Sequence, residues 1–108
     1  IVVLAHGKWH DRQVVSTAWI DRSTARYTEI GSRGYGYLWW HQDFDVTRDG
    51  RSVRVKTIVA SGNGGQKIYV IPSLEAVVVF TGGSYNTGNS APNLMMPREI
   101  LPSLLFER

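Results

Sequence analysis

The sequence predicts an α+β domain in which an antiparallel sheet of about four strands is flanked by helices. Three observations predict it: helical spacing of apolar residues near both ends, a period of two in the middle, and short turn signals that join the strands directly. A chain of 108 residues is long enough for one domain with one core. With 43% hydrophobic and 19% charged residues, the composition is that of a globular protein.

Two short helices are expected before the sheet. Residues 16–25 place apolar side chains at helical spacing, and Ser16 is a favourable N-cap. Residues 1–5 read as the last turns of an earlier helix that Gly7 ends, and the polar stretch 6–12 reads as the connecting turn. Because the chain starts with neither an initiator Met nor a signal-peptide pattern, we expect it to be a piece of a longer protein.

Strands and short turns are expected to follow these helices. The expected strands are residues 35–42, 52–60, 67–71 and 74–81. Asp49-Gly50 predicts a hairpin between the first two, because this pair readily adopts the positive φ angles of a tight turn. The last strand is apolar on both faces, as is typical of a central strand. A polar loop over residues 82–92 and a terminal helix over residues 97–108, with Pro97 at its first position, complete the prediction.

Composition and spacing argue against several classes of function. The net charge is +3, but the basic residues are dispersed, which argues against a nucleic-acid partner. No apolar run reaches the ~18 residues of a membrane span, and there is no cysteine for a disulfide, a thiolate metal site or a nucleophile. The histidines are too scattered for a metal site and are expected to be solvated or to cap other elements, so we expect neither a metal nor another cofactor. We expect a bacterial protein, and the sequence leaves periplasm and cytoplasm both open.

Several stretches carry a resemblance to a known family. They are YGYLWW (35–40), ASGNGGQKIYVIP (60–72) and LEAVVVFTGG (74–83), with weaker matches upstream at 7–9, 13–16 and 19–20. In this order and spacing they resemble the C-terminal part of β-lactamase-related serine hydrolases, a family that includes class C β-lactamases, penicillin-binding proteins and esterases. The resemblance implies the β-lactamase/transpeptidase-like fold. It also implies that residues 1–108 are the C-terminal part of a single hydrolase domain, whose nucleophile-bearing part lies upstream.

The resemblance further implies an active-site role for residues 60–63. Hydrolases of this family carry a third motif, Lys-Thr-Gly or His-x-Gly, on a strand of the sheet, and Ala60-Ser61-Gly62 corresponds to it. Ser61 would offer a hydroxyl to the substrate, and Gly62 would let the substrate lie flat against the strand. The backbone N–H of Asn63 would be one of two oxyanion donors. Ala60, at the substrate-binding position, replaces the usual Lys or His, which weakens the case for β-lactam hydrolysis.

The family's first two motifs are not found in the sequence. No serine is followed by Lys in a Ser-x-x-Lys pattern, so no serine is expected to have an amine beside it to take its proton. Ser84-Tyr85-Asn86 resembles the second motif but follows the third, which is the wrong chain order. We therefore expect that the 108 residues alone do not hydrolyse nitrocefin or p-nitrophenyl acetate. The expected partners are a small ester or amide substrate and the remainder of the hydrolase domain.

The aromatic residues leave other functions open. The chain holds four Trp and five Tyr. Trp39 and Trp40 would point to opposite faces of their strand, so that one enters the core and the other, with Tyr37, lines a substrate cleft. One alternative is a non-catalytic module that binds a glycan or a peptidoglycan fragment. Another is a structural subunit that completes the active site of a partner chain.

Two further patterns are interpreted as structural. Gly64-Gly65 resembles a phosphate-binding loop, but no Lys-Ser/Thr pair and no helix follow it. Asp43 and Asp45 resemble a catalytic carboxylate pair. Because Arg48 and Arg51 are near in sequence, we expect the two carboxylates to lie at a solvated hairpin end.

Overall fold

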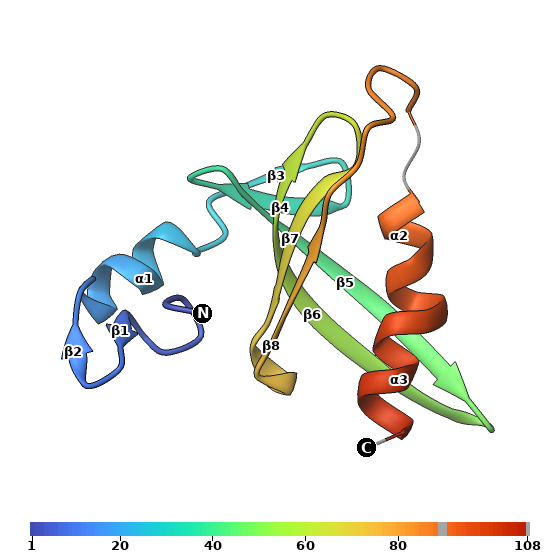
Figure 1. Ribbon diagram of the computed structural model, residues 1–108, viewed down its shortest axis with the longest axis horizontal. Helices are drawn as coiled ribbons and strands as arrows, with labels where there is room; N and C mark the ends of the chain where they lie inside the picture. Colours follow the sequence, from blue (N-terminus) through green and yellow to red (C-terminus); the bar gives the residue numbers. More distant parts are fainter. Residues whose placement is uncertain (89–90, 108) are drawn as a thin grey trace.

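The computed structural model describes residues 1–88 and 91–107 and has the predicted α+β fold. Its centre is a six-stranded antiparallel sheet in the order β3-β4-β5-β6-β7-β8, so each strand pairs with its neighbours in the sequence (Figure 1). A separate two-stranded hairpin and a short helix precede this sheet, and a helical segment follows it. The predicted 82–92 loop and 97–108 helix both extend into residues outside the described part.

The expected order of elements is largely confirmed. The strands of the main sheet are β3 (Thr28–Ile30), β4 (Arg33–Gly36), β5 (Trp39–Arg48), β6 (Arg51–Gly62), β7 (Gln66–Ile71) and β8 (Ala76–Phe80). The other elements are β1 (Lys8–Trp9), β2 (Arg12–Gln13), α1 (Thr17–Ser23), the 3-10 turn η1 (Pro72–Leu74), α2 (Ala91–Met95), the π-helical η2 (Met96–Ile100) and α3 (Leu101–Phe106). Asp49 and Gly50 form the predicted turn between β5 and β6, with φ angles of 51° and 74°.

The single strand predicted over residues 35–42 is wrong, because the chain reverses within it. Tyr37 and Leu38 have φ angles of 45° and 71° and form the two-residue turn between β4 and β5. Such a turn needs positive φ at both positions, where Asn and Gly are the usual residues. A Tyr-Leu pair carries no turn signal. Together with the short β3, this reversal gives the sheet six strands instead of about four.

β8 is an edge strand, whereas the pattern predicted a central one. β7 pairs with it on one side, and no other strand of the described part pairs with it on the other. The side chain of Val79 is 61% exposed. An apolar pattern on both faces is typical of a strand that is covered and paired on all sides. The sequence of β8 is therefore typical of a strand that is paired and covered on all sides, and the described residues leave part of it exposed.

The helices at the two ends were predicted with unequal success. Ser16 caps α1 as expected, since its Oγ accepts a hydrogen bond of 3.1 Å from the N–H of Trp19. Residues 1–5 form turns instead of a regular helix, but the N–H of Ala5 donates a hydrogen bond of 3.0 Å to the carbonyl of Ile1, and Gly7, with a φ of 88°, follows as the expected end of the turn. The C-terminal helical segment begins at Ala91, before Pro97, and the wide π turn accommodates this proline. No helix of the described part is long and apolar enough to cross a membrane.

The C-terminal helical segment covers one side of the sheet, here called the helix face (Figure 1). Met96 and Leu101 are fully buried against it. The strand residues buried in the same cluster are Phe44, Val46, Val55, Val59, Tyr69 and Ile71. Each buried side chain of this size contributes about 1.5–3 kcal/mol, so the helix face holds the main core. The N-terminal segment and α1 lie near the opposite face, where Ile20 and Val70 are buried.

Candidate functional site

The predicted third motif lies at the end of β6, where one backbone edge is open. β5 pairs with β6 as far as Val59, whose partner is Trp40. Residues 60–62 continue the strand and, among the described strands, pair with β7 alone. Successive N–H groups of an antiparallel strand point alternately to its two sides. Part of the backbone of the motif therefore faces the side that β5 has left.

The loop after Gly62 is held in place by the segment that follows β8. Nδ2 of Asn63 donates a hydrogen bond of 2.8 Å to Oδ1 of Asn86, and Oδ1 of Asn63 accepts one of 3.0 Å from the N–H of Asn86. The side-chain amide of Gln66 donates to the carbonyl of Gly82. These bonds fix the position of the exposed Asn63 relative to both β7 and β8.

Gly64 occupies a position at which a side chain would clash with its surroundings. Its φ is 88°, and a Cβ atom there would lie 2.8 Å from the ring of Tyr85. Its carbonyl accepts a hydrogen bond of 3.2 Å from the N–H of Ser84. A cavity of about 170 Å³ adjoins Gly64 and Gly65. The glycine pair thus allows two loops to approach each other beside a small cavity, which is a structural role of the kind expected for it.

Ser61 has an amine neighbour that the motif search did not reveal. Lys67 lies opposite Ser61 on β7, and its Nζ donates a hydrogen bond of 2.6 Å to Oγ of Ser61. The expectation that no serine lies beside an amine is therefore wrong. The search followed spacing along the chain, whereas the contact is made across a hairpin. The signal was the loop itself, because a hairpin closed by Gly62 and Gln66 places Ser61 opposite Lys67.

The protonated form of Lys67 is less stable relative to the neutral amine than it is in a free lysine. Partial burial lowers its pKa from the usual value, and the positive charge of Arg33 lowers it further.

Tyr69 lies two residues after Lys67 on the same face of β7. It is fully buried and donates a hydrogen bond of 2.6 Å to Oδ1 of Asn93. Burial raises the pKa of Tyr69 to about 12, so its phenol stays protonated at neutral pH and links β7 to α2.

The aromatic residues predicted to bind substrate fall into separate groups. Trp40 packs against the core, as expected for one of the Trp pair, while Trp39 is half-buried. Tyr37 lies at the β4–β5 turn, where it stacks on Trp19 at 5.8 Å between ring centroids and meets Tyr27 edge-on at 5.1 Å. Tyr37 is 53% exposed and Trp19 50% exposed. No pattern along the chain indicates this cluster, because its members come from three separate segments.

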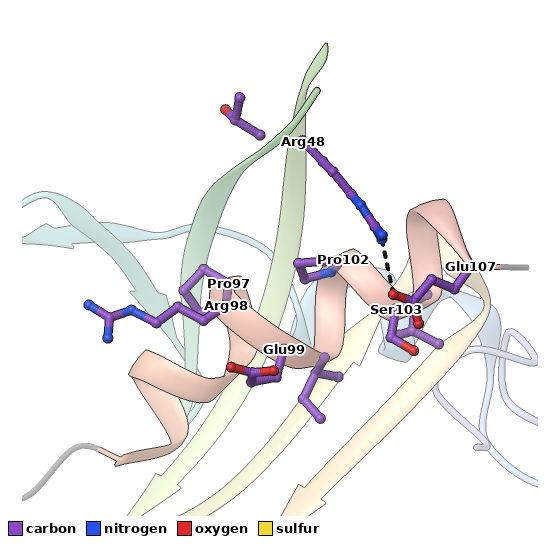
Figure 2. Close-up of a pocket in the computed structure, with 10 residues that line it drawn as sticks. Arg48, Pro97, Arg98, Glu99, Pro102, Ser103 and Glu107 are labelled. Atoms are coloured by element: carbon purple, nitrogen blue, oxygen red, sulfur yellow. Dashed lines mark hydrogen bonds and ion pairs between the residues drawn. The ribbon is translucent and has the colours of Figure 1, made fainter. Parts of the chain in front are cut away.

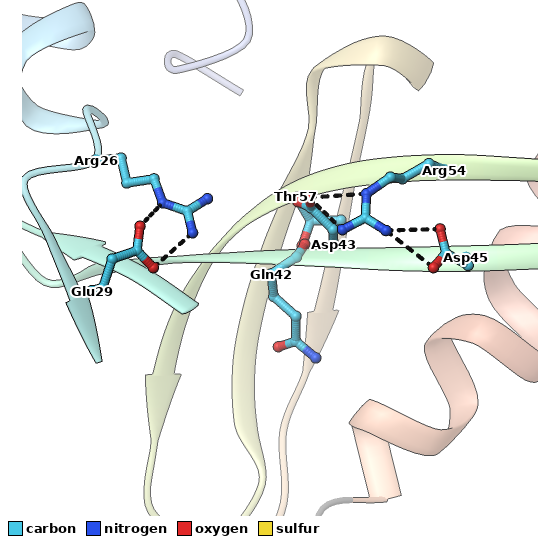
Figure 3. Close-up of polar contacts among 7 residues, drawn as sticks. All are labelled: Arg26, Glu29, Gln42, Asp43, Asp45, Arg54 and Thr57. Atoms are coloured by element: carbon cyan, nitrogen blue, oxygen red, sulfur yellow. Dashed lines mark hydrogen bonds and ion pairs between the residues drawn. The ribbon is translucent and has the colours of Figure 1, made fainter. Parts of the chain in front are cut away.

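Asp43 and Asp45 are both engaged by one guanidinium (Figure 3). Arg54 places Nη2 at 3.2 Å from Oδ2 of Asp43 and Nη1 at 3.1 Å from Oδ2 of Asp45. The arginines expected beside these carboxylates, Arg48 and Arg51, instead contact the C-terminal helix. The arrangement is that of an ion-pair cluster along β5 and β6.

A cavity of about 910 Å³ lies between β5 and the C-terminal helical segment (Figure 2). Arg48 and Glu107 meet at its edge, with 3.0 Å between Nη1 and Oε1. Arg48 precedes the turn at the opposite end of β6 from Gly62, so this cavity contains none of the predicted site residues.

His41 differs from the expected solvated histidine. It is half-buried, and its Nε2 is enclosed without a hydrogen-bond partner in the described part of the chain. Residues 1–88 and 91–107 contain no group of three or more His, Asp or Glu side chains that could hold a metal ion.

The fold and the geometry together define an α+β protein with a glycine-rich loop at an open strand edge. No protein-family model matches the chain, and no curated protein matches it significantly.

Proposed function

We propose that this chain is the C-terminal part of a β-lactamase-related serine hydrolase and that residues 60–63 line its active site. The open edge of β6 beyond Val59 is the observation that supports this proposal most directly. A backbone N–H can act as an oxyanion donor when it is free of a strand partner and held in a fixed position. Asn63 directly follows the open end of β6 in the β6–β7 turn, and the hydrogen bonds between Asn63 and Asn86 hold this turn in place.

In this proposal the reaction is acyl transfer to water. An upstream serine attacks the carbonyl of an ester or an amide, and an upstream Lys and Tyr manage its proton. The negative charge that develops on the carbonyl oxygen is stabilised by the N–H of Asn63, a type of contact worth about 3–4 kcal/mol in the transition state. Ser61 and Gly62 position the substrate along the strand. The chemistry needs neither a metal nor another cofactor.

The remainder of the hydrolase domain is the proposed partner of β8. The strand is apolar on both faces, Val79 is exposed, and its outer edge is unpaired in the described part of the chain. An unprotected apolar edge favours association with another strand. The same edge supports the alternative in which this chain completes a separate partner, and co-purification with a Ser-x-x-Lys polypeptide tests that alternative.

The test compares two substitutions at one position in the protein expressed from its whole reading frame. Asn63→Pro removes the backbone N–H, whereas Asn63→Ala keeps it, and both remove the side-chain bonds to Asn86. We expect Asn63→Pro to lower kcat for a p-nitrophenyl ester by about 10²–10³-fold relative to Asn63→Ala. Steady-state kinetics measure the difference, and circular dichroism checks that both variants fold.

A fluorophosphonate probe locates the nucleophile in the same protein. The proposal expects labelling of a serine outside residues 1–108. Absence of both labelling and ester turnover would overturn it. Labelling of Ser61 would contradict the assigned roles, because it would place the nucleophile within this chain, with Lys67 as its base.

A glycan-binding module remains the second candidate, and the exposed stack of Trp19 and Tyr37 favours it. A flat aromatic surface of this kind can receive the face of a sugar ring. Calorimetric titration with a soluble peptidoglycan fragment tests it. Binding that Trp19→Ala abolishes, and that the equally exposed control Trp9→Ala keeps, supports the module.

A further inference from the structure

A cavity of about 570 Å³, here called the β5–β6 cavity, lies on the face of the sheet opposite to the helix face, and none of residues 60–63 lines it. Phe44 on β5 and Val55 on β6 are buried on the helix face. Because alternate residues of a strand share a face, the two strands present His41, Asp43 and Lys56 on the opposite face, where all three line the cavity. Its volume is within the range of small-molecule sites, about 300–1,000 Å³.

His41 contributes a ring nitrogen that is shielded from solvent and has no partner. Its Nε2 is enclosed and makes no hydrogen bond within residues 1–88 and 91–107. Buried polar atoms of folded proteins are nearly always hydrogen-bonded, to protein, to water or to a ligand. In the tautomer that carries its proton on Nε2, this nitrogen is a donor. An acceptor atom of a bound molecule would therefore satisfy it.

Gly34 allows the side chain of Arg26 to lie beside His41. Gly34 is the cross-strand partner of His41, and a Cβ atom at Gly34 would lie 2.4 Å from Cγ and Nε of Arg26. Arg26 also lines the β5–β6 cavity. Its Nε and Nη2 donate to Glu29 at 2.6 Å and 2.8 Å (Figure 3). The N–H groups of Nη1 have no acceptor in the described part of the chain, so they can donate to a ligand.

Two further donors line the cavity from other elements, Lys56 on β6 and Ser73 on η1. Both are exposed, and no ion pair within residues 1–88 and 91–107 engages Lys56. Asp43 lies opposite Lys56, but it is engaged by Arg54, with 3.2 Å between Oδ2 and Nη2. The charged residues that line the cavity are thus three cations and one carboxylate that is already paired.

We propose that the β5–β6 cavity binds a phosphate group, held by the four donors that line it: Arg26, His41, Lys56 and Ser73. The donors come from four separate segments, and a phosphate group presents strong acceptor oxygens in several directions. A carboxylate has two oxygens in one plane and matches fewer of these donors. Ile58 and Pro72 form an apolar part of the wall, which suits the organic part of a phosphate ester.

The histidine ¹⁵N signals of the whole protein measure binding during titration with sodium phosphate at constant pH and ionic strength. We expect the Nε2 signal of His41 to shift saturably, with a Kd of order millimolar. His10 is exposed and does not line the cavity, so its signal is an internal reference for pH. Phenyl phosphate distinguishes the two sources of the group. Tighter binding than that of inorganic phosphate assigns the site to an ester, and equal binding assigns it to free phosphate.

Substitutions test which donors hold the phosphate. Lys56→Gln should weaken binding by about fivefold or more, because a charge-assisted hydrogen bond is lost. Ser73→Ala removes a neutral donor and should weaken binding by about twofold or more. Lys8→Gln is the matched control, because it removes the same charge from an exposed lysine on β1, outside the cavity. Circular dichroism checks that all three variants fold.

The inference fails on any of three results. They are an equal shift of His41 with sodium chloride, equal phosphate affinity in Lys56→Gln and Lys8→Gln, and acetate binding as tight as that of phosphate. Because no turnover enters the measurement, the result is independent of the proposed function. A protein that binds phosphate in this cavity but labels no serine would keep the phosphate site and lose the hydrolase assignment.

Discussion

Tyr69 shows how its surroundings change the chemistry of a single side chain. The residue is fully buried, and its hydroxyl joins β7 to Asn93 on α2. Because burial raises its pKa to about 12, the folded state holds the phenolic proton more tightly than the unfolded state does. The resulting stabilisation is fully present below the unfolded pKa near 10 and is lost as pH rises toward the folded value.

Tyr69→Phe is therefore expected to change both stability and its pH dependence. The substitution leaves Oδ1 of Asn93 without its partner, which should lower the free energy of unfolding by about 1–2 kcal/mol at pH 7. The variant should also lack the extra loss of stability that the parent shows above pH 10. Urea unfolding at pH 7 and at about pH 10.5 measures both effects. Tyr37→Phe, which changes an exposed hydroxyl, is the control, and an equal loss in that variant would contradict the prediction.

Residue patterns pointed to some members of the proposed site and missed another for a physical reason. The resemblance pointed to Ser61 and Asn63 because they lie within one short stretch of the chain, at the third motif and directly after it. Lys67 was missed because its contact with Ser61 depends on which strands pair and in which register. A motif search along the chain cannot detect a contact that a hairpin creates.

At the level of elements, the β6–β7 loop and the segment after β8 form one unit. Hydrogen bonds from Ser84 to Gly64 and between Asn63 and Asn86 join them. The close approach depends on Gly64, whose φ of 88° and contact with Tyr85 leave no room for a side chain. The loop is therefore sensitive to a single added methyl group.

Gly64→Ala and Gly50→Ala separate the effect of φ from that of crowding. Both glycines have positive φ, but a Cβ at Gly50 meets nothing within 4 Å. Each substitution should cost about 1 kcal/mol for its backbone conformation. Gly64→Ala should lose a further 1–3 kcal/mol or so, because the ring of Tyr85 must move. Chemical denaturation compares the two variants, and equal losses would contradict the crowding argument.

The turn at Tyr37 and Leu38 is the element that the pattern predicted least well. Local alternation continues through it, so the sequence reads as one strand. The reversal places two non-glycine residues at positive φ and leaves Leu38 79% exposed. Packing of Tyr37 on Trp19 and Tyr27 accompanies this conformation, and those contacts come from outside the segment.

At the scale of the whole molecule, the two faces and two edges of the sheet are unequally covered. The helix face is closed by α2, η2 and α3. On the other face, Ile68 and Val79 form an adjacent exposed pair across β7 and β8. Because β8 also has an unpaired edge in the described part, its surroundings favour association with another strand.

Val79→Lys should reduce self-association of the 108-residue chain, because a charged side chain on an edge strand opposes pairing with another copy. Ile68→Lys is the control, since it adds the same charge to the same face one strand away from the edge. Analytical ultracentrifugation over a range of concentrations measures the association. Equal effects of the two substitutions would indicate association through the face instead of the edge.

The sequence by itself determined the α+β class, the Ser16 cap, the Asp49-Gly50 hairpin and the strands that became β6 and β7. These features depend on local periodicity and turn chemistry, which are determined by residues close together in the sequence. Only the tertiary structure decided the reversal at Tyr37, the edge position of β8 and the contact between Ser61 and Lys67. Those features depend on strand order and register, which are set by how distant segments pack together.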